Sequence, residues 1–174
     1  MAFHVPDVFP TRFRFVVSSR SGVKTAAKRL GATHLLSLVD RGVRTFCPPR
    51  VGRPNHLELY FEDEENVAHP SAPRRDQVET FLAWGRRLPD GASLVVNCEA
   101  GRCRSSAAAF LLAVQDLGLD RAQEALDLVL ALRPLARPNL LVVRYGDELL
   151  DAGGALTALA EARARAVDPT SRPN

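Results

Sequence analysis

The stretch Val95–Ser106, VVNCEAGRCRSS, passes from an apolar run into a short polar loop and then into the start of an apolar helix. A strand–loop–helix turn of this kind points the loop amides and the first free N–H groups of the helix at one spot, where they bind an anion. Cys98 stands at the start of the loop, and Arg104 follows after five intervening residues. The stretch therefore predicts an anion site that carries a candidate nucleophile.

The residue types in this loop suit the transfer of a phosphoryl group. A helix N-terminus and a neighbouring guanidinium can lower the pKa of a cysteine from about 8.5 to roughly 3.5–7.5, which makes a thiolate available. The planar fork of Arg104 matches two phosphoryl oxygens, and Ser105 can hydrogen-bond the sulfur and ease its departure. Gly101 lets the backbone turn its amides inward. We expect the phosphate-binding residues to be Glu99, Ala100, Gly101, Arg102, Cys103 and Arg104.

Strands alternate with helices over the first two thirds of the chain, and helices alone follow. This order is typical of an α/β fold: a mostly parallel central sheet of about four or five strands with helices on both faces. The patterns predict strands over 12–19, 33–40, 56–61 and 93–98. They predict helices over 21–31, 71–88, 105–118, 120–132, 140–153 and 155–166, the second of them capped by Ser71.

The 174 residues can bury one substantial core. We expect a single catalytic domain over 12–166, an N-terminal extension over 1–11 and a disordered tail over 167–174. The net charge of +3 rests almost wholly on scattered arginines, which favours a phosphorylated protein or small phosphate monoester over nucleic acid. We expect a cytoplasmic protein with no membrane span, because no apolar run reaches spanning length and no secretory signal is evident. The sequence leaves the oligomeric state open.

The three cysteines form no CxxC pair and have no histidine at metal-ligand spacing. We therefore expect no structural disulfide, no metal and no other cofactor.

The segment CEAGRCRS, Cys98–Ser105, resembles the signature loop of the cysteine-dependent protein tyrosine phosphatases, and its Ala100–Gly101 pair resembles the dual-specificity branch. The likeness extends upstream to HLELYFEDEEN and downstream to RPLARPNLLVVRYGDELL, and the pattern is most similar to small bacterial predicted tyrosine phosphatases. The resemblance implies a phosphatase-like fold. It also implies hydrolysis of phosphotyrosine, and of phosphoserine and phosphothreonine, through a phosphocysteine on Cys98.

Two residues depart from the pattern of that superfamily. Asn97 stands where a histidine usually precedes the nucleophile; it can still donate hydrogen bonds that order the loop, but it brings no positive charge. Glu99 adds a carboxylate, which we expect to point outward.

Cleavage of a phosphate ester needs a proton donor for the leaving oxygen and later a base that activates water. The candidates lie in Glu62–Glu65, and alignment with the strand-then-Asp pattern of the family favours Asp63. Glu62 and Glu64 remain alternatives, as does a merely solvated acidic loop. We interpret Asp40, at the end of an earlier strand, as structural.

Other functions remain open on the sequence. Arg102 beside Arg104 suits inositol phosphates, phospholipids or nucleotide headgroups, whereas Asn97 and the unsettled acid suit a non-catalytic phosphate-binding module. Cys103 is either a small residue beneath the loop or a thiol that protects Cys98 from overoxidation; an arsenate-reductase-like redox enzyme would need a further resolving thiol.

Overall fold

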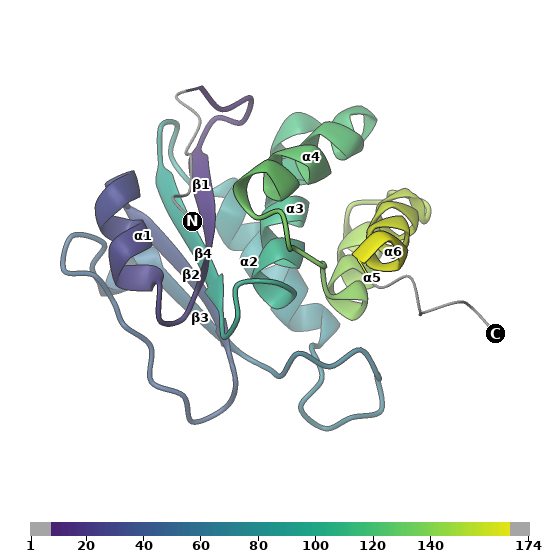
Figure 1. The fold of residues 1–174 in the computed structure, drawn as a ribbon, viewed down its shortest axis with the longest axis horizontal. Helices are drawn as coiled ribbons and strands as arrows, with labels where there is room; N and C mark the ends of the chain where they lie inside the picture. The colour runs from purple at the N-terminus through teal and green to yellow at the C-terminus, as the bar shows by residue number, and fades with distance from the viewer. Residues whose placement is uncertain (1–7, 168–174) are drawn as a thin grey trace.

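The structure, a computed structural model, describes residues 8–167 (Figure 1). Its strands are β1 (Arg14–Ser19), β2 (His34–Val39), β3 (His56–Tyr60) and β4 (Ser93–Cys98). Its α-helices are α1 (Val23–Leu30), α2 (Arg75–Arg86), α3 (Arg104–Leu117), α4 (Ala122–Leu132), α5 (Leu140–Leu149) and α6 (Ala155–Val167). Two 3-10 helices, η1 (Arg53–Asn55) and η2 (Leu119–Arg121), precede β3 and α4.

The four strands form one parallel sheet in the order β1-β4-β2-β3. The central strands β2 and β4 are buried almost throughout, which explains their continuous runs of Leu and Val. All four strands run in one direction, so their carboxyl ends lie at the same edge of the sheet. The predicted α/β fold with a parallel sheet is confirmed.

Helices cover both faces of the sheet, as the sequence predicted. Helix α1 lies against one face, and α2, α3 and α4 lie against the other, with α5 and α6 farther out (Figure 1). Helix α3 is the central helix, and every residue from Arg104 to Val114 is buried. Its sequence is apolar nearly all round because neighbours surround it.

Several element boundaries differ from the sequence predictions. Ser71 is not the N-cap of α2, because that helix begins only at Arg75. Its N-cap is Arg74, whose backbone N–H donates to Gln77 Oε1 (2.9 Å). The side chain of a residue in the first turn of the helix thus accepts the hydrogen bond of the N-cap amide. Strand β1 begins at Arg14 instead of residue 12, and α5 ends at Leu149 instead of residue 153.

Parts of the predicted flanks fall outside the described residues, namely 1–7 of the extension and 168–174 of the tail, while Val167 is the last residue of α6. Within residues 8–167, no helix is both long enough and apolar enough to cross a membrane.

Candidate active site

The loop over residues 99–103 joins the carboxyl end of β4 to the first turn of α3. Cys98, the last residue of β4, is 2% exposed, and its Sγ lies 3.1 Å from Ser105 Oγ. The structure therefore brings Cys98 and Ser105 together, and Arg104 is the residue before Ser105 at the start of α3. The N-terminal amides of α3, which have no partner within the helix, follow Cys98 in the same strand–loop–helix turn.

The backbone of the loop has a shape that only glycine fits at its middle. Gly101 has φ +64°, and a Cβ there would lie 2.5–2.7 Å from backbone atoms of Ser18 and Ser19. Arg133, after α4, donates from Nε to the Gly101 carbonyl and from Nη2 to the Ala100 carbonyl, both at 2.9 Å. Each trans peptide places its N–H opposite its C=O. The amides of Gly101 and Arg102 therefore face away from Arg133.

Arg104 is anchored at one end of its guanidinium and unpaired at the other. Its Nη1 donates to Asp40 Oδ1 and to the carbonyl oxygen of Phe61, each at 2.5 Å, and its side chain is 4% exposed. Its buried Nε has no hydrogen-bond partner among the described residues. An arginine oriented in this way can present its Nε edge to two oxygens of a phosphoryl group.

Asp40 follows directly after β2, and Phe61 follows directly after β3. Both strand ends thus reach Arg104 from the same edge of the sheet. The interpretation of Asp40 as a purely structural residue missed this ion pair with the predicted phosphate-binding arginine.

Asp63 lies beside the loop rather than in an isolated solvated turn. Its Oδ1 accepts a hydrogen bond from Asn139 Nδ2 (2.9 Å). Asn139 is the N-cap of α5, and its backbone N–H donates to the Cys103 carbonyl (3.2 Å). Asn139 therefore links the acidic segment, the phosphate loop and α5.

The other acidic residues of this segment have different contacts. Glu64 Oε1 accepts from the amides of Glu65 and Asn66, and these two hydrogen bonds lower its pKa. Glu65 Oε1 accepts from the amide of Leu140 and lies 3.7 Å from Arg137. Asp63 is thus the acidic residue that Asn139 links to the loop at Cys103, and its role as general acid remains a prediction.

Cys103 is half-buried next to Asp63. Burial and then the hydrogen bond to Asp63 raise its pKa to about 12. With its pKa raised in this way, the Cys103 thiol is neutral at physiological pH.

The remaining charged side chains of the loop point outward. Glu99 is exposed and pairs with Arg20, whose Nε lies 2.6 Å from Glu99 Oε2, and this hydrogen bond lowers the pKa of Glu99. Arg102 is exposed too, and its Nε donates to the carbonyl of Leu135 (3.2 Å). Neither side chain is directed at Cys98 by these contacts.

A buried chain of hydrogen bonds lies beneath the nucleophile. Ser37 Oγ donates to Asn97 Oδ1 (2.8 Å) and lies 2.9 Å from His56 Nε2. Because the single hydroxyl proton goes to Asn97, the imidazole must donate to Ser37. Burial lowers the pKa of His56, which favours the neutral ring. Asn97 thus accepts a hydrogen bond at Oδ1, and the donation from its side chain that the sequence analysis allowed stays a prediction.

The sequence analysis also missed the residues that hold the loop from outside, namely Arg20, Arg133 and Asn139. The Asn139 signal was present, because a Pro-Asn pair ahead of an apolar run is a helix-start pattern. Among residues 8–167, no group of three His, Cys, Asp or Glu side chains is placed to hold a metal ion.

The fold is that of the cysteine-dependent tyrosine phosphatases, and within them of the dual-specificity branch. Human DUSP28 is 24% identical with a TM-score of 0.61, covering 81% of this chain and 94% of its own. The Yvh1 phosphatase domain from Chaetomium thermophilum is 20% identical with a TM-score of 0.55, covering 83% and 94%.

PTPMT1, solved in complex with PI(5)P, is 12% identical with a TM-score of 0.51, covering 86% of this chain and 90% of its own. No family model matches the chain, and no curated protein does either. The predicted resemblance is therefore confirmed at the level of the fold.

Proposed function

We propose that this protein hydrolyses phosphate monoesters, phosphotyrosine foremost, through a phosphocysteine intermediate on Cys98. The observation that carries this proposal is the buried Cys98 sulfur 3.1 Å from Ser105, in the same turn as an Arg104 whose Nε is buried and unpaired. A site that only packed against its own protein would leave no buried guanidinium nitrogen without a partner. A bound phosphoryl oxygen supplies that partner.

In the first step, the Cys98 thiolate attacks phosphorus. The new S–P bond forms as the bond from phosphorus to the leaving oxygen breaks, and that oxygen takes a proton from Asp63. Arg104 and the loop amides bind the equatorial oxygens and stabilise the charge that develops on them. In the second step, Asp63 removes a proton from water, which attacks phosphorus. The S–P bond then breaks, and a hydrogen bond from Ser105 stabilises the departing thiolate.

The test is a hydrolysis screen of an aryl phosphate, phosphopeptides, phosphoinositides and soluble phosphates, with a chelator present. We expect turnover of the aryl phosphate and phosphotyrosine peptides, competitive inhibition by vanadate, and none of this turnover from Cys98→Ser. Cys47→Ser is the matched control, because Cys47 lies in the loop after β2, where its thiol contacts the neighbouring Pro48 carbonyl. Wild-type turnover by Cys98→Ser would refute the phosphocysteine route.

The same screen separates the finer alternatives. Hydrolysis confined to phosphoinositides would assign the protein to lipid headgroups, which is the ligand class that the PTPMT1 complex contains. Vanadate binding without turnover of any substrate would identify a phosphate-binding module.

A further inference from the structure

Strand β3 is an edge of the sheet, because it pairs only with β2. The amide of Phe61 donates to the Val39 carbonyl on β2 (3.0 Å), so the Tyr60 carbonyl in the same peptide unit faces away from β2. The backbone alternates along a strand, so the N–H and C=O of Glu58 and the N–H of Tyr60 also face outward. Of these four groups, only the Tyr60 carbonyl has a partner within residues 8–167, the side-chain amide of Gln77 at 3.0 Å.

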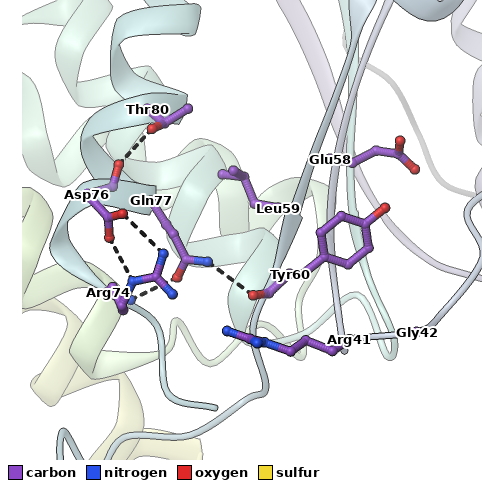
Figure 2. Close-up of a pocket in the computed structure, with 9 residues that line it drawn as sticks. All are labelled: Arg41, Gly42, Glu58, Leu59, Tyr60, Arg74, Asp76, Gln77 and Thr80. Carbon is purple, nitrogen blue, oxygen red and sulfur yellow. Dashed lines mark hydrogen bonds and ion pairs between the residues drawn. The ribbon is translucent and has the colours of Figure 1, made fainter. Parts of the chain in front are cut away.

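A groove of about 540 Å³ lies along this edge, between β3 and the start of α2 (Figure 2). In Figure 2, Gln77 reaches from α2 to the Tyr60 carbonyl across the groove. Glu58, Tyr60, Gln77 and Thr80 line its sides, and Arg41 and Gly42 come from the turn after β2. The groove therefore combines unpaired strand backbone with a mixed lining of polar and apolar side chains, Leu59 among the latter. Unpaired edge backbone is the feature that extended peptides recognise.

Among the charged side chains that line the groove, Arg41 makes no ion pair within residues 8–167. Arg74 is paired with Asp76 by two hydrogen bonds, of 3.0 and 3.1 Å. Glu58 accepts from Thr45 and lies 3.7 Å from Arg53. Arg41 is exposed and makes no ion pair within the described part of the chain. An acidic side chain or a phosphate is the complement of this guanidinium.

The groove and the candidate active site are built from the same two strand ends. Arg41 follows Asp40, which holds Arg104, and Tyr60 precedes Phe61, whose carbonyl also holds Arg104. Neighbouring strands are about 4.8 Å apart, so the outer edge of β3 is about 10–15 Å from Cys98 on β4. An extended peptide rises about 3.3 Å per residue and spans that distance in three or four residues.

We propose that this groove binds an extended segment of a phosphorylated polypeptide substrate. The segment adds to the outer edge of β3 as a further strand and places an acidic side chain, three or four residues from its phosphorylated residue, against Arg41. A lipid headgroup has no row of backbone donors and acceptors that would match Glu58 and Tyr60. This inference rests on the proposed function, since the phosphorylated residue occupies the loop at Cys98.

The test uses phosphotyrosine peptides that carry Glu or Ala three or four residues from the phosphotyrosine. Their binding to Cys98→Ser protein is measured by fluorescence anisotropy, and their kcat/KM is measured with catalytically intact protein. Arg41→Ala is compared with Arg44→Ala, an exposed arginine of the same loop that does not line the groove. Thr80→Trp fills the groove from an exposed helical position, and peptides N-methylated at successive residues probe the strand pairing.

We expect Arg41→Ala to weaken binding of the Glu peptide about three- to fivefold, the range of an exposed ion pair. It should leave the Ala peptide and a small aryl phosphate unchanged. Thr80→Trp should weaken both peptides. N-methylation should weaken binding about five- to tenfold at alternate positions, where it removes a hydrogen bond.

Equal effects of Arg41→Ala and Arg44→Ala, or N-methylation effects without alternation, would overturn the proposal. The proposal would also be overturned if Arg41→Ala weakened binding to phosphoinositide vesicles and left peptide binding unchanged, because that result would assign the groove to lipid headgroups. If the unsubstituted protein hydrolyses no aryl phosphate, the proposed function fails, whereas anisotropy still decides whether the groove binds peptide.

Discussion

Removal of the Asp40 carboxylate should disable Arg104 without touching the loop. Asp40→Ala deletes one of the two acceptors that hold Nη1, and leaves the carbonyl of Phe61 as the other. Breaking a fully buried ion pair costs about 3–5 kcal/mol. Because the Asp40 side chain is 44% exposed and one acceptor remains, we expect a loss of about 2 kcal/mol.

If that loss falls on the transition state, kcat/KM for an aryl phosphate decreases about thirtyfold. Vanadate inhibition should weaken in parallel, because the same guanidinium edge binds both. Asp40→Asn keeps an acceptor oxygen and loses only the charge, so its loss should be smaller, about fivefold. Thermal unfolding of each variant separates this effect from loss of folded protein, since about 2 kcal/mol lowers Tm by roughly 4–8 °C.

Asp90→Asn is the matched control, because Asp90 is 89% exposed and lies 3.8 Å from Arg12, far from the loop. Asp40→Ala that stays folded and keeps the kcat/KM and vanadate affinity of the unsubstituted protein would refute the reasoning. It would mean that the carbonyl of Phe61 alone orients Arg104.

Three further outcomes follow from the contacts around the loop. Asp63→Asn should slow hydrolysis of alkyl and tyrosyl phosphates far more than of activated aryl phosphates, because a good leaving group departs without a proton; equal losses in a comparison of kcat/KM would argue against Asp63 as the acid. Gly101→Ala should destabilise the fold by about 3 kcal/mol in urea unfolding, since its Cβ meets backbone of Ser18 and Ser19 at a positive φ; unchanged stability would contradict the loop geometry. Cys103, with a pKa of about 12, should react with iodoacetamide at pH 8 about a thousandfold more slowly than an unhindered thiol, by peptide mass spectrometry. Asp63→Asn should speed that labelling only in part, because burial is the larger cause; rapid labelling of the unsubstituted protein would show that Cys103 is not held as a neutral thiol.

Local patterns were enough to predict the parts of the site that are close in sequence. The run into Cys98, the glycine in the loop and the apolar start of α3 lie within a dozen residues, and each has a local physical signature. The parallel sheet was predictable for a similar reason, because strands that alternate with helices leave few other topologies.

The contacts that orient Arg104 could not be predicted in this way. Asp40 is 64 residues distant in sequence, and it reaches Arg104 only because β2 lies beside β4 in the sheet. No periodicity encodes that strand order, so a carboxylate at a strand end looked structural. The prediction that Ser71 caps α2 was wrong for the opposite reason. A local cap pattern was present at Ser71, but the Gln77 side chain accepts from the Arg74 amide, and the N-cap lies three residues later.

The charges around the loop divide into those that shape the backbone and one that is left for a ligand. Arg20 is neutralised by Glu99 on the β1 side, and Arg133 is directed at loop carbonyls on the α4 side. These contacts hold the loop from both flanks before any anion arrives. Arg104 differs because its anchors occupy only Nη1, and Nε remains buried without a partner among residues 8–167. Under the proposed function, an oxyanion meets a loop whose carbonyls are already held by Arg133 and an arginine that is already oriented. Catalysis by electrostatic stabilisation depends on such preorganisation, because dipoles fixed in advance need no reorganisation as charge develops.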